Sequence, residues 1–525
     1  MVKLGTVVEA STTSEVEFVY EEGVRPQVGE YVAVRSDDGW VLGMVTHVIR
    51  GSRELTGRSL LSAEDADRVI RLVGEPRQWA KGRVKLLGTV AGEGDSVRLD
   101  LPRTPPPSGA DVIRAPAEEL RRLLCPEGGI EVGTLLTRPD VPVSVDPDEL
   151  ISRHLAILAV TGAGKSNAVA VLVDGILKMG GAVLLFDMHS EYVDMEVGEG
   201  EVLPAEPALN VNLLGVGEVA RLLGISFEKA AKQYVYLRKF WRAARRVVAA
   251  RRGAEVVQEA GLEGEDPDSM LDVTLALVSL AIRRLRGEDV ISPAPDVQKR
   301  DEASVYSLMV RIEDLKERYG RILSPRARDV LSLLDYGRAV VVDLGSVGDE
   351  AADVIVGHYL GRLLLEAKRG GDVPIPIMVV LEEAHALIPE GRETYTRSAA
   401  SRIAREGRKF GVSLTLVSQR PKRLDSDVLS QMVNKIILRI VEPEDQAYVR
   451  RATEFLSEEL IAYLPSLNVG EAVLVGPMVR MPAIVKIRLF PGKRAGAGIS
   501  AKRAWASRRA QRGEWTPEGY GRVVR

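Results

Sequence analysis

The sequence predicts an α/β protein with a mostly parallel sheet, a small N-terminal β-barrel, a helical insertion and an extended C-terminal tail. An apolar run at 155–160 leads into a glycine-rich loop and then into an apolar run of helical length at 168–177. Strands alternate with helical stretches from 338 to 440, which is typical of a parallel sheet covered on both faces. Short segments rich in Val and Thr within residues 1–100 favour a small barrel.

Composition limits the class of protein. The chain has 525 residues, enough for about three domains of ~150 residues each. A net charge of −3 excludes a strongly basic coat for non-specific nucleic-acid binding, but it leaves room for a local basic channel. Cys125 is the only cysteine, which excludes a disulfide framework and suits a reducing compartment. Since no signal peptide or membrane-spanning run is seen, we expect a cytoplasmic protein with no membrane contact.

The chain divides into five segments. The boundaries predicted from composition are 1–110 for the barrel, 111–214 for a linker and the first part of the α/β core, 215–325 for the helical insertion, 326–490 for the second part of the core, and 491–525 for the tail. Four prolines make 101–110 a stiff boundary. The tail carries nine cations against two carboxylates and has no core of its own, so we expect it to lie on another surface or to stay disordered.

The expected elements follow from local composition. Short strands are expected at 5–9, 15–20, 30–35, 40–49 and 83–91, a short helix at 116–124, a Pro-containing approach to the core at 130–152, a buried strand at 182–187, and amphipathic helices at 227–252, 270–286 and 303–319. The first of these helices is rich in arginine; a solvated face is the expected interpretation and DNA contact the alternative. Further strands are expected at 338–345, 375–381, 412–418 and 435–440, helices at 349–368 and 394–410, and a hairpin at 469–475 and 481–488.

The glycine-rich loop, Thr161-Gly162-Ala163-Gly164-Lys165-Ser166, has the composition of a phosphate-binding loop. Its glycines let successive N–H groups point inward, and the following helix adds partial positive charge. Lys165 would reach the β- and γ-phosphates of ATP, and Ser166 would hold Mg²⁺. The predicted cofactor-binding residues here are Gly162, Ala163, Gly164, Lys165, Ser166 and Asn167. Ala159 stands where the full pattern has glycine, which puts the outer turn in doubt; a plain glycine-rich turn is the alternative.

Two acids directly follow the apolar strand at 376–381. We predict that Glu382 steadies the Mg²⁺ ion and that Glu383 activates the attacking water. A second group of carboxylates, beginning with Asp187, follows the strand at 182–187, where it would face a ligand crevice or lie in a solvated loop.

Two further polar groups complete the predicted chemistry. The helix at 394–410 ends in cations, of which Arg408, with Arg405 as second choice, is predicted to reach the γ-phosphate held by a neighbouring subunit. Simple stabilisation of a helix C-terminus is the alternative. Gln419 follows the strand at 412–418 and is predicted to contact the γ-phosphate or its attacking water; a buried structural amide is the alternative.

Taken in order, T-G-A-G-K-S, L-E-E-A-H, E-G-R-K-F-G-V and V-S-Q-R-P resemble the HerA family, the prokaryotic hexameric DNA translocases of the FtsK–HerA class. The resemblance covers nearly the whole chain. It implies a RecA-like P-loop ATPase core and a homohexamer that moves double-stranded DNA through its pore by ATP hydrolysis. It also implies a NurA-type nuclease as partner, an association with the double-strand-break processing nuclease complex, and a role in DNA end resection for recombinational repair. The tail matches the family's segment that braces a neighbouring subunit.

The resemblance also assigns residues. Lys165, Ser166, Glu383, Arg408 and Gln419 match the family's phosphate, metal, catalytic, trans-acting and sensor groups. Additional nucleotide contacts are implied for Arg153, Lys486 and Ile487. For DNA we predict two pore loops, 389–397 and 422–427, with Arg392, Arg397, Lys422 and Arg423 as contacts.

Two other classes remain open. A conjugation-type ATPase that exports DNA or protein shares the same core, but the absence of a membrane anchor argues against it. An assembly scaffold that uses ATP as a slow switch would not need the complete set of Lys165, Glu383 and Arg408.

Overall fold

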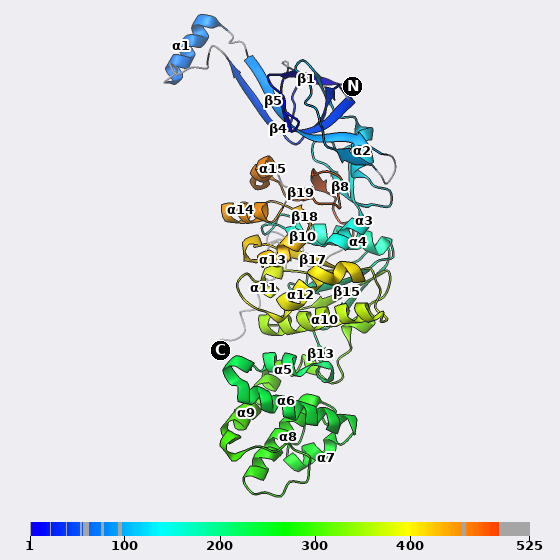
Figure 1. Ribbon diagram of the computed structural model, residues 1–525, viewed down its shortest axis with the longest axis vertical. Coiled ribbons are helices and arrows are strands. Elements are labelled where there is room, and N and C mark those ends of the chain that lie inside the picture. The colour runs from blue at the N-terminus through cyan, green and yellow to red at the C-terminus, as the bar shows by residue number, and fades with distance from the viewer. Residues whose placement is uncertain are drawn as a thin grey trace, which may run out of the picture.

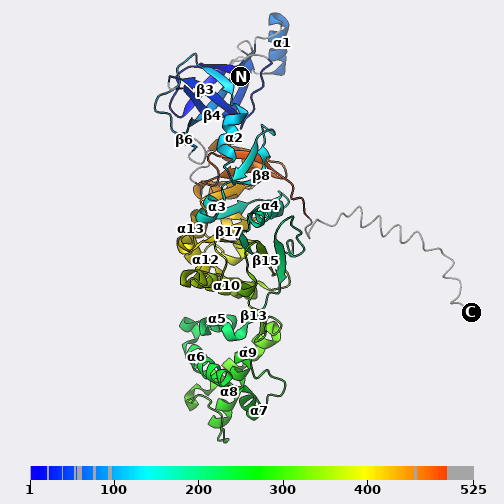
Figure 2. The same cartoon turned by 90° about the vertical axis from the view of Figure 1, so that its right-hand side faces the viewer.

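The computed structural model describes residues 2–20, 23–37, 39–52, 55, 62–74, 78–92, 97–453 and 458–492. A β-barrel, an α/β core and a helical insertion follow one another along its long axis, with the barrel and the insertion at opposite ends (Figures 1 and 2). The tail predicted at 491–525 lies outside the described residues, apart from its first two residues.

The N-terminal strands close into a barrel, as predicted. Their bounds are β1 (Lys3–Val8), β2 (Glu15–Val19), β3 (Tyr31–Ser36), β4 (Gly39–Ser52), β5 (Gln78–Ala91), β6 (Arg98–Asp100) and β7 (Asp111–Arg114). The sheet order is β2-β1-β7-β3-β4-β5-β6, and an additional pairing of β2 with β5 closes six of these strands into the barrel. Phe18 and Val32 are completely buried inside it. Since β7 belongs to this sheet, the barrel extends past residue 110, where composition placed its end.

Two features of the barrel differ from the expected short strands. β4 and β5 are 14 residues long each, and helix α1 (Ala63–Val73) lies in the connection between them. Ser62 caps α1, yet none of the helix residues is buried, and α1 projects away from the barrel (Figure 1). No element was predicted for residues 63–73, although a serine cap followed by acids in the first turn is a local helix signal.

An 11-stranded sheet forms the core, in the order β12-β15-β11-β16-β17-β10-β18-β19-β20-β8-β9. The strands from β12 to β18 in this order run parallel, and those from β18 to β9 run antiparallel, so the mostly parallel α/β core is confirmed. Their bounds are β8 (Ile130–Leu135), β9 (Pro142–Val145), β10 (Leu155–Leu158), β11 (Ala182–Asp187), β12 (Glu201–Ala205), β15 (Arg338–Asp343), β16 (Ile377–Leu381), β17 (Val412–Ser418), β18 (Asn434–Ile437), β19 (Glu471–Val475) and β20 (Ala483–Ile487).

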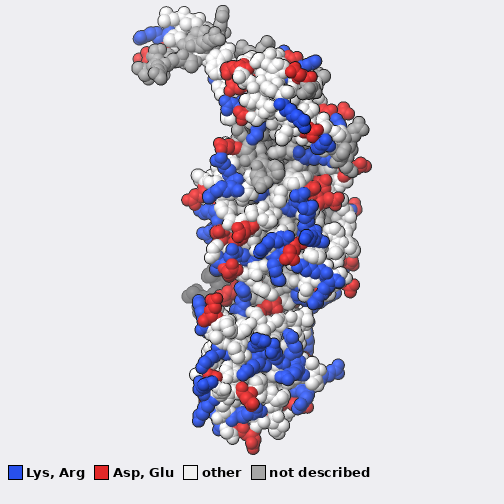
Figure 3. All heavy atoms as spheres, in the orientation of Figure 1, with Lys and Arg blue, Asp and Glu red and all other residues white. Residues whose placement is uncertain are grey.

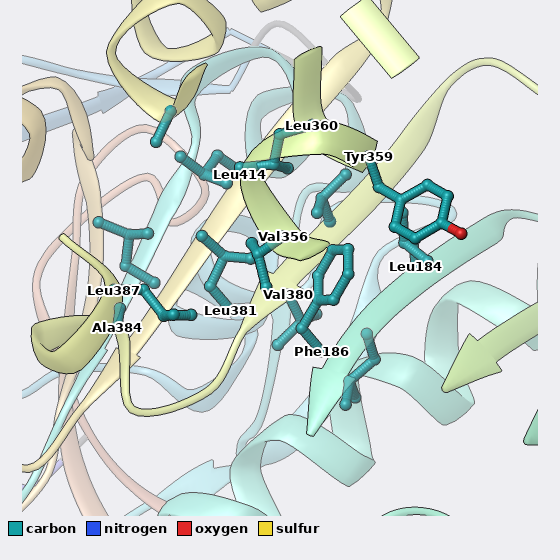
Figure 4. Close-up of a cluster of buried hydrophobic side chains, with 14 of the residues drawn as sticks. Leu184, Phe186, Val356, Tyr359, Leu360, Val380, Leu381, Ala384, Leu387 and Leu414 are labelled. Atoms are coloured by element: carbon teal, nitrogen blue, oxygen red, sulfur yellow. The ribbon is translucent and has the colours of Figure 1, made fainter. Parts of the chain in front are cut away.

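The central strands are buried along their whole length because helices cover the sheet. Helix α4 (Lys165–Lys178) packs along β8, β10 and β11. Helix α10 (Asp349–Arg369) packs on α12 (Tyr395–Glu406), and its Tyr359 lies beside Leu184 and its Leu360 beside Leu414 of the sheet (Figure 4). The remaining core helices are α2 (Ala117–Leu124), α3 (Pro147–Arg153), α11 (Ala384–Leu387), α13 (Ser426–Gln431), α14 (Pro443–Arg451) and α15 (Glu458–Tyr463).

The helical insertion begins and ends at a parallel two-stranded pair, β13 (Leu209–Asn210) and β14 (Leu323–Ser324). Its helices are α5 (Val216–Leu222), α6 (Phe227–Ala249), α7 (Gly253–Ala260), α8 (Met270–Leu285) and α9 (Glu302–Tyr319). Glu218 of α5 joins the insertion to the core, because its Oε1 lies 2.6 Å from His358 Nδ1 of α10 and 2.9 Å from the hydroxyl of Tyr395 on α12. In the described part of the chain, no helix is both long and apolar enough to cross a bilayer.

Candidate active site

The phosphate loop connects β10 to α4, as the glycine pattern predicts. Gly162 (φ +76°) and Gly164 (φ +106°) take left-handed conformations. A Cβ on Gly164 would lie 3.2 Å from the backbone nitrogen of Gly470, so only glycine fits this turn easily. Ala159 still belongs to the sheet ladder, since its N–H donates to the Ser418 carbonyl at 3.1 Å. The loop therefore turns after Ala159, which removes the doubt that this departure raised.

Lys165, Glu383 and Gln419 meet at the carboxyl ends of neighbouring strands β10, β16 and β17. Lys165 forms a buried ion pair with Glu383 Oε1, and the Gln419 amide donates to the same oxygen. Burial opposes the charged form of Glu383, but the Lys165 ammonium outweighs that effect and lowers the pKa of Glu383. Glu383 is therefore ionised at neutral pH. A carboxylate that takes a proton from water, or accepts a hydrogen bond from it, has to be in this ionised form.

The backbone of Glu383 has φ +45°, a left-handed conformation that is uncommon outside glycine. Strained conformations of this kind cluster at functional sites. His385 supports the carboxylate, because its Nδ1 lies 3.2 Å from Glu383 Oε2 and 3.3 Å from the Ser418 hydroxyl. His385 has no role predicted from the sequence, although it ends the L-E-E-A-H motif two residues after Glu383.

Glu382 lies beside this group and is 1% exposed. The Tyr192 hydroxyl donates to Glu382 Oε1 at 3.4 Å, and Lys165 Nζ lies 4.0 Å from the same oxygen. Glu382 Oε2 is buried with no hydrogen-bond partner among the described residues. Burial raises the pKa of Glu382 to about 7. A buried carboxylate oxygen without a partner is costly unless a cation meets it.

The arrangement fits a divalent cation. Carboxylate oxygens are the preferred protein ligands of Mg²⁺, and Glu382 supplies an unpartnered one. Ser166, the other predicted ligand, lies beside the same Tyr192 that bonds Glu382. A bound Mg²⁺ would supply positive charge against the phosphates and orient them.

Arg153 and Arg408 lie at the opposite end of the sheet from Lys165. Arg153 ends α3 just before β10, and Arg408 lies in the 3-10 turn Gly407–Phe410 just before β17. The seven residues of β17, about 23 Å at 3.3 Å each, separate Arg408 from Gln419. That is farther than an arginine side chain extends. The fold therefore does not bring these two arginines to the phosphate loop of their own chain.

The two arginine segments are neighbours, because α3 packs against the turn that carries Arg408. His154 ties them together: its Nδ1 accepts from the Leu414 N–H at 3.0 Å, and its Nε2 lies 3.2 Å from the Ala404 carbonyl. Burial lowers the pKa of His154 to about 4, so the ring stays neutral and can accept that bond. Arg153 lies 3.3 Å from Glu149, whereas the exposed Arg408 guanidinium makes no hydrogen bond or ion pair with the described residues.

The other predicted nucleotide contacts, Lys486, Ile487 and Asn167, lie in or next to the segments that pack against the phosphate loop. The Gly470 N–H donates to the Ala163 carbonyl at 2.9 Å, and the Ile487 N–H donates to the Gly470 carbonyl at 2.8 Å. Lys486 Nζ donates to the Val469 carbonyl at 2.7 Å. Lys486 and Ile487 thus lie in the layer behind the phosphate loop. The side chain of Asn167 points the same way, since its amide donates to the Arg488 carbonyl and its Oδ1 accepts from the Phe490 N–H.

The two loops predicted to contact DNA lie side by side. Pro389 and Leu424 form a β-bridge, and the Ser426 N–H donates to Glu390 Oε2 at 2.7 Å. Their cations differ in availability. Arg397 pairs with Asp425 at 2.6 Å and with Glu393 at 2.8 Å, and Lys422 pairs with Glu444 at 2.6 Å. Arg392 and Arg423 are exposed and form no ion pair with the described residues.

The phosphate loop, the acid pair and the glutamine on three neighbouring strands define an ATP-hydrolysing enzyme of the P-loop class. A family model described as "Helicase HerA, central domain" matches residues 130–363, and one for the HAS barrel domain matches residues 4–92. The chain belongs to the HerA family of helicases.

Several curated relatives match over almost their entire length. The chain is 38% identical to the DNA double-strand break repair helicase HerA of Sulfurisphaera tokodaii, over 96% of each chain. It is 36% identical to the protein of the same name from Sulfolobus acidocaldarius, again over 96% of each. A solved structure of the bacterial conjugative coupling protein TrwB aligns with a TM-score of 0.45 at 15% identity, covering 71% of this chain and 92% of that one.

Proposed function

We propose that the chain is an ATP-driven helicase and translocase of double-stranded DNA that acts in double-strand break repair as a ring of six identical subunits. The observation that carries this proposal is the division of the nucleotide machinery between the two ends of the sheet. Lys165, Glu383 and Gln419 face one end, and Arg153 and Arg408 face the other. A closed ring of head-to-tail contacts lets each chain complete the site of the next.

The resting contacts suggest how ATP engages the site. Lys165 is neutralised by Glu383, so the γ-phosphate of ATP competes with that carboxylate for the ammonium. Glu383, released from Lys165, can then orient a water for in-line attack. Gln419 contacts both Glu383 and Thr161, so it can report whether a γ-phosphate separates them. Ser166 and Glu382 are the residues that would hold Mg²⁺, which supplies charge to stabilise the transferring phosphoryl group.

The barrel is the surface we assign to a NurA-type nuclease. It lies at the end of the core opposite the helical insertion (Figure 1). A nuclease held at one end of a ring would receive DNA that the core drives through the pore, which supports a role in end resection. Contact with the double-strand-break processing nuclease complex belongs to the same proposal.

ATP turnover should rise severalfold when duplex DNA of mixed sequence is added to the chain with Mg²⁺. The contacts expected for translocation are to phosphates, so the response should depend strongly on salt and little on sequence. Single-stranded DNA and an unfolded protein serve as the comparison substrates in the same steady-state ATPase assay. Stimulation by unfolded protein, and none by duplex DNA, would favour the export ATPase instead.

Helix α6 offers unpaired cations for the DNA backbone in addition to those of the two pore loops. Nine Lys and Arg residues and no carboxylate lie between 229 and 254. Arg238, Arg242, Arg245 and Arg246 are exposed on one face of α6 and form no ion pair with the described residues. Lys and Arg side chains gather over this part of the insertion (Figure 3). Unpaired cations favour polyanion binding because no local ion pair has to be broken first.

The triple variant Arg238→Ala, Arg242→Ala, Arg245→Ala should bind duplex DNA with a weaker salt dependence. Each lost phosphate contact lowers the slope of log K against log salt by about 0.9, so a change of about 2 to 3 is expected. The measurement is fluorescence anisotropy over a salt series. The matched control is Arg252→Ala, Arg283→Ala, Arg286→Ala, which removes three cations of the same insertion that already pair with Glu255, Glu288 and Glu302. Equal slopes for the two triple variants would show that the α6 face is only solvated.

A further inference from the structure

A tight turn follows β11 and brings His189 to the acid pair. Asp187, completely buried at the end of β11, accepts the His189 N–H at 3.2 Å and the Tyr192 N–H at 2.7 Å. Ser190 takes a left-handed conformation (φ +55°), and its hydroxyl donates to Asp343 Oδ1 at 2.7 Å. A residue with positive φ persists only where its surroundings hold it. The position of His189 is therefore set by three bonds to two strands, although its own side chain is half exposed.

The His189 ring faces the unpartnered oxygen of Glu382. Nδ1 lies 3.8 Å from Glu382 Oε2, the atom that is buried without a hydrogen bond. That separation is too long for a hydrogen bond. Two ligands bound at about 2.1 Å to one cation lie between about 3 and 4.2 Å apart, depending on the angle between them. The pair is therefore spaced as two ligands of one ion.

The chain's other histidines are engaged differently. His154 and His358 are buried and hold backbone or carboxylate groups, and His385 is bonded to Ser418. His47 lies on the barrel beside Thr46. The ligand atoms of His189, Glu382 and Glu383 all lie within 4.8 Å of one another, close enough to share a metal ion.

We propose that His189 and Glu382 together bind a first-row transition-metal cation of the Mn²⁺ class, directly through imidazole and carboxylate, at the nucleotide site. The proposal rests on the assignment of Glu382 to the metal in the proposed function and adds His189 as a residue that determines which metal binds. Mg²⁺ strongly prefers oxygen ligands and retains its waters, whereas transition metals accept imidazole. His189 thus makes the site hold Mn²⁺ more tightly than Mg²⁺, and does so before ATP arrives.

The test uses the full chain with MnCl₂ and no nucleotide. Titration followed by electron paramagnetic resonance should show one Mn²⁺ bound per chain, and electron spin echo modulation should show coupling to an imidazole ¹⁴N nucleus. His189→Ala should weaken Mn²⁺ binding on the order of 10- to 100-fold and abolish the ¹⁴N coupling. The Mg²⁺ affinity of the His189→Ala chain, measured by competition with Mn²⁺, should differ from that of the wild type by less than about threefold, because Mg²⁺ does not use the imidazole as a ligand.

Three variants make the result decisive. His47→Ala removes an exposed histidine far from the site and should leave Mn²⁺ binding and ¹⁴N coupling intact. Glu382→Gln should weaken Mn²⁺ binding, because the carboxylate charge is lost. His189→Asp should restore much of the Mn²⁺ affinity through oxygen while the ¹⁴N coupling stays absent. Persisting ¹⁴N coupling, or unchanged Mn²⁺ affinity, in His189→Ala would overturn the proposal. A histidine-dependent Mn²⁺ site in a chain whose ATPase ignores DNA would instead count against the proposed function alone.

Discussion

The Arg408→Ala chain is expected to hydrolyse ATP about 10³- to 10⁵-fold more slowly than the wild type, because an arginine supplied in trans stabilises transition-state charge on the γ-phosphate. Nucleotide binding should change little, since Arg408 lies at the end of the sheet away from the phosphate loop of its own chain. Steady-state ATPase assays with duplex DNA measure the loss. Lys409→Ala is the matched control, because Lys409 is the next residue and is also exposed. Arg405→Ala tests the alternative trans-acting arginine, Arg405, whose Nε donates to the Ser401 carbonyl.

Mixing variants tests whether the site is shared. A Lys165→Ala chain keeps Arg408, and an Arg408→Ala chain keeps Lys165, so a ring containing both regains some complete interfaces. With random assembly from equal amounts, about a quarter of the interfaces would be complete, and ATPase activity should recover toward that fraction. Lys165→Ala mixed with Glu383→Gln should not recover, because both residues serve the same side of the interface. Equal recovery in the two mixtures, or a fully active single subunit, would refute the shared site.

Replacing Glu383 with Gln is expected to lower kcat by roughly 10²- to 10⁴-fold, the range for loss of a general base. ATP affinity should be retained or increased, because Lys165 no longer has a carboxylate partner that competes with phosphate. Rapid-quench ATPase and nucleotide-binding assays on the same preparation separate the two effects.

Glu199→Gln provides the control for this substitution. Its side chain is exposed on the segment between β11 and β12, and it forms no ion pair with the described residues. It should leave kcat unchanged. Slow ATP hydrolysis that is the same in wild type and Glu383→Gln would favour the scaffold, since a switch needs nucleotide binding but little turnover.

Chemistry that depends on adjacent residues was predictable from the sequence. The phosphate loop, the acid pair and Gln419 each follow a short apolar strand directly, and carboxyl ends of parallel strands meet at one edge of a sheet. For this reason the proximity of Lys165, Glu383 and Gln419 could be predicted from the sequence, and their contacts confirm it. It did not predict β8 and β9, because the segment 130–152 is interrupted by prolines and lies at the sheet's antiparallel edge.

Side-chain partners were beyond sequence analysis because they come from distant segments. Whether a cation is free depends on which carboxylate faces it, and only the fold pairs Arg397 with Asp425 or leaves Arg408 exposed. In the same way, only the fold shows that the Asn167 side chain bonds the Arg488 carbonyl and the Phe490 N–H.

Residue types and their order along the chain were thus sufficient to predict the barrel, the α/β core, and the glycine-rich loop and acid pair that meet in it, because the signal for each lies within a few adjacent residues. Three-dimensional packing decided on which end of the sheet each group lies. It placed Lys165 and Arg408 a strand's length apart and His189 against Glu382. The physical reason is that distances between segments are set by strand order and helix packing, which no local pattern contains.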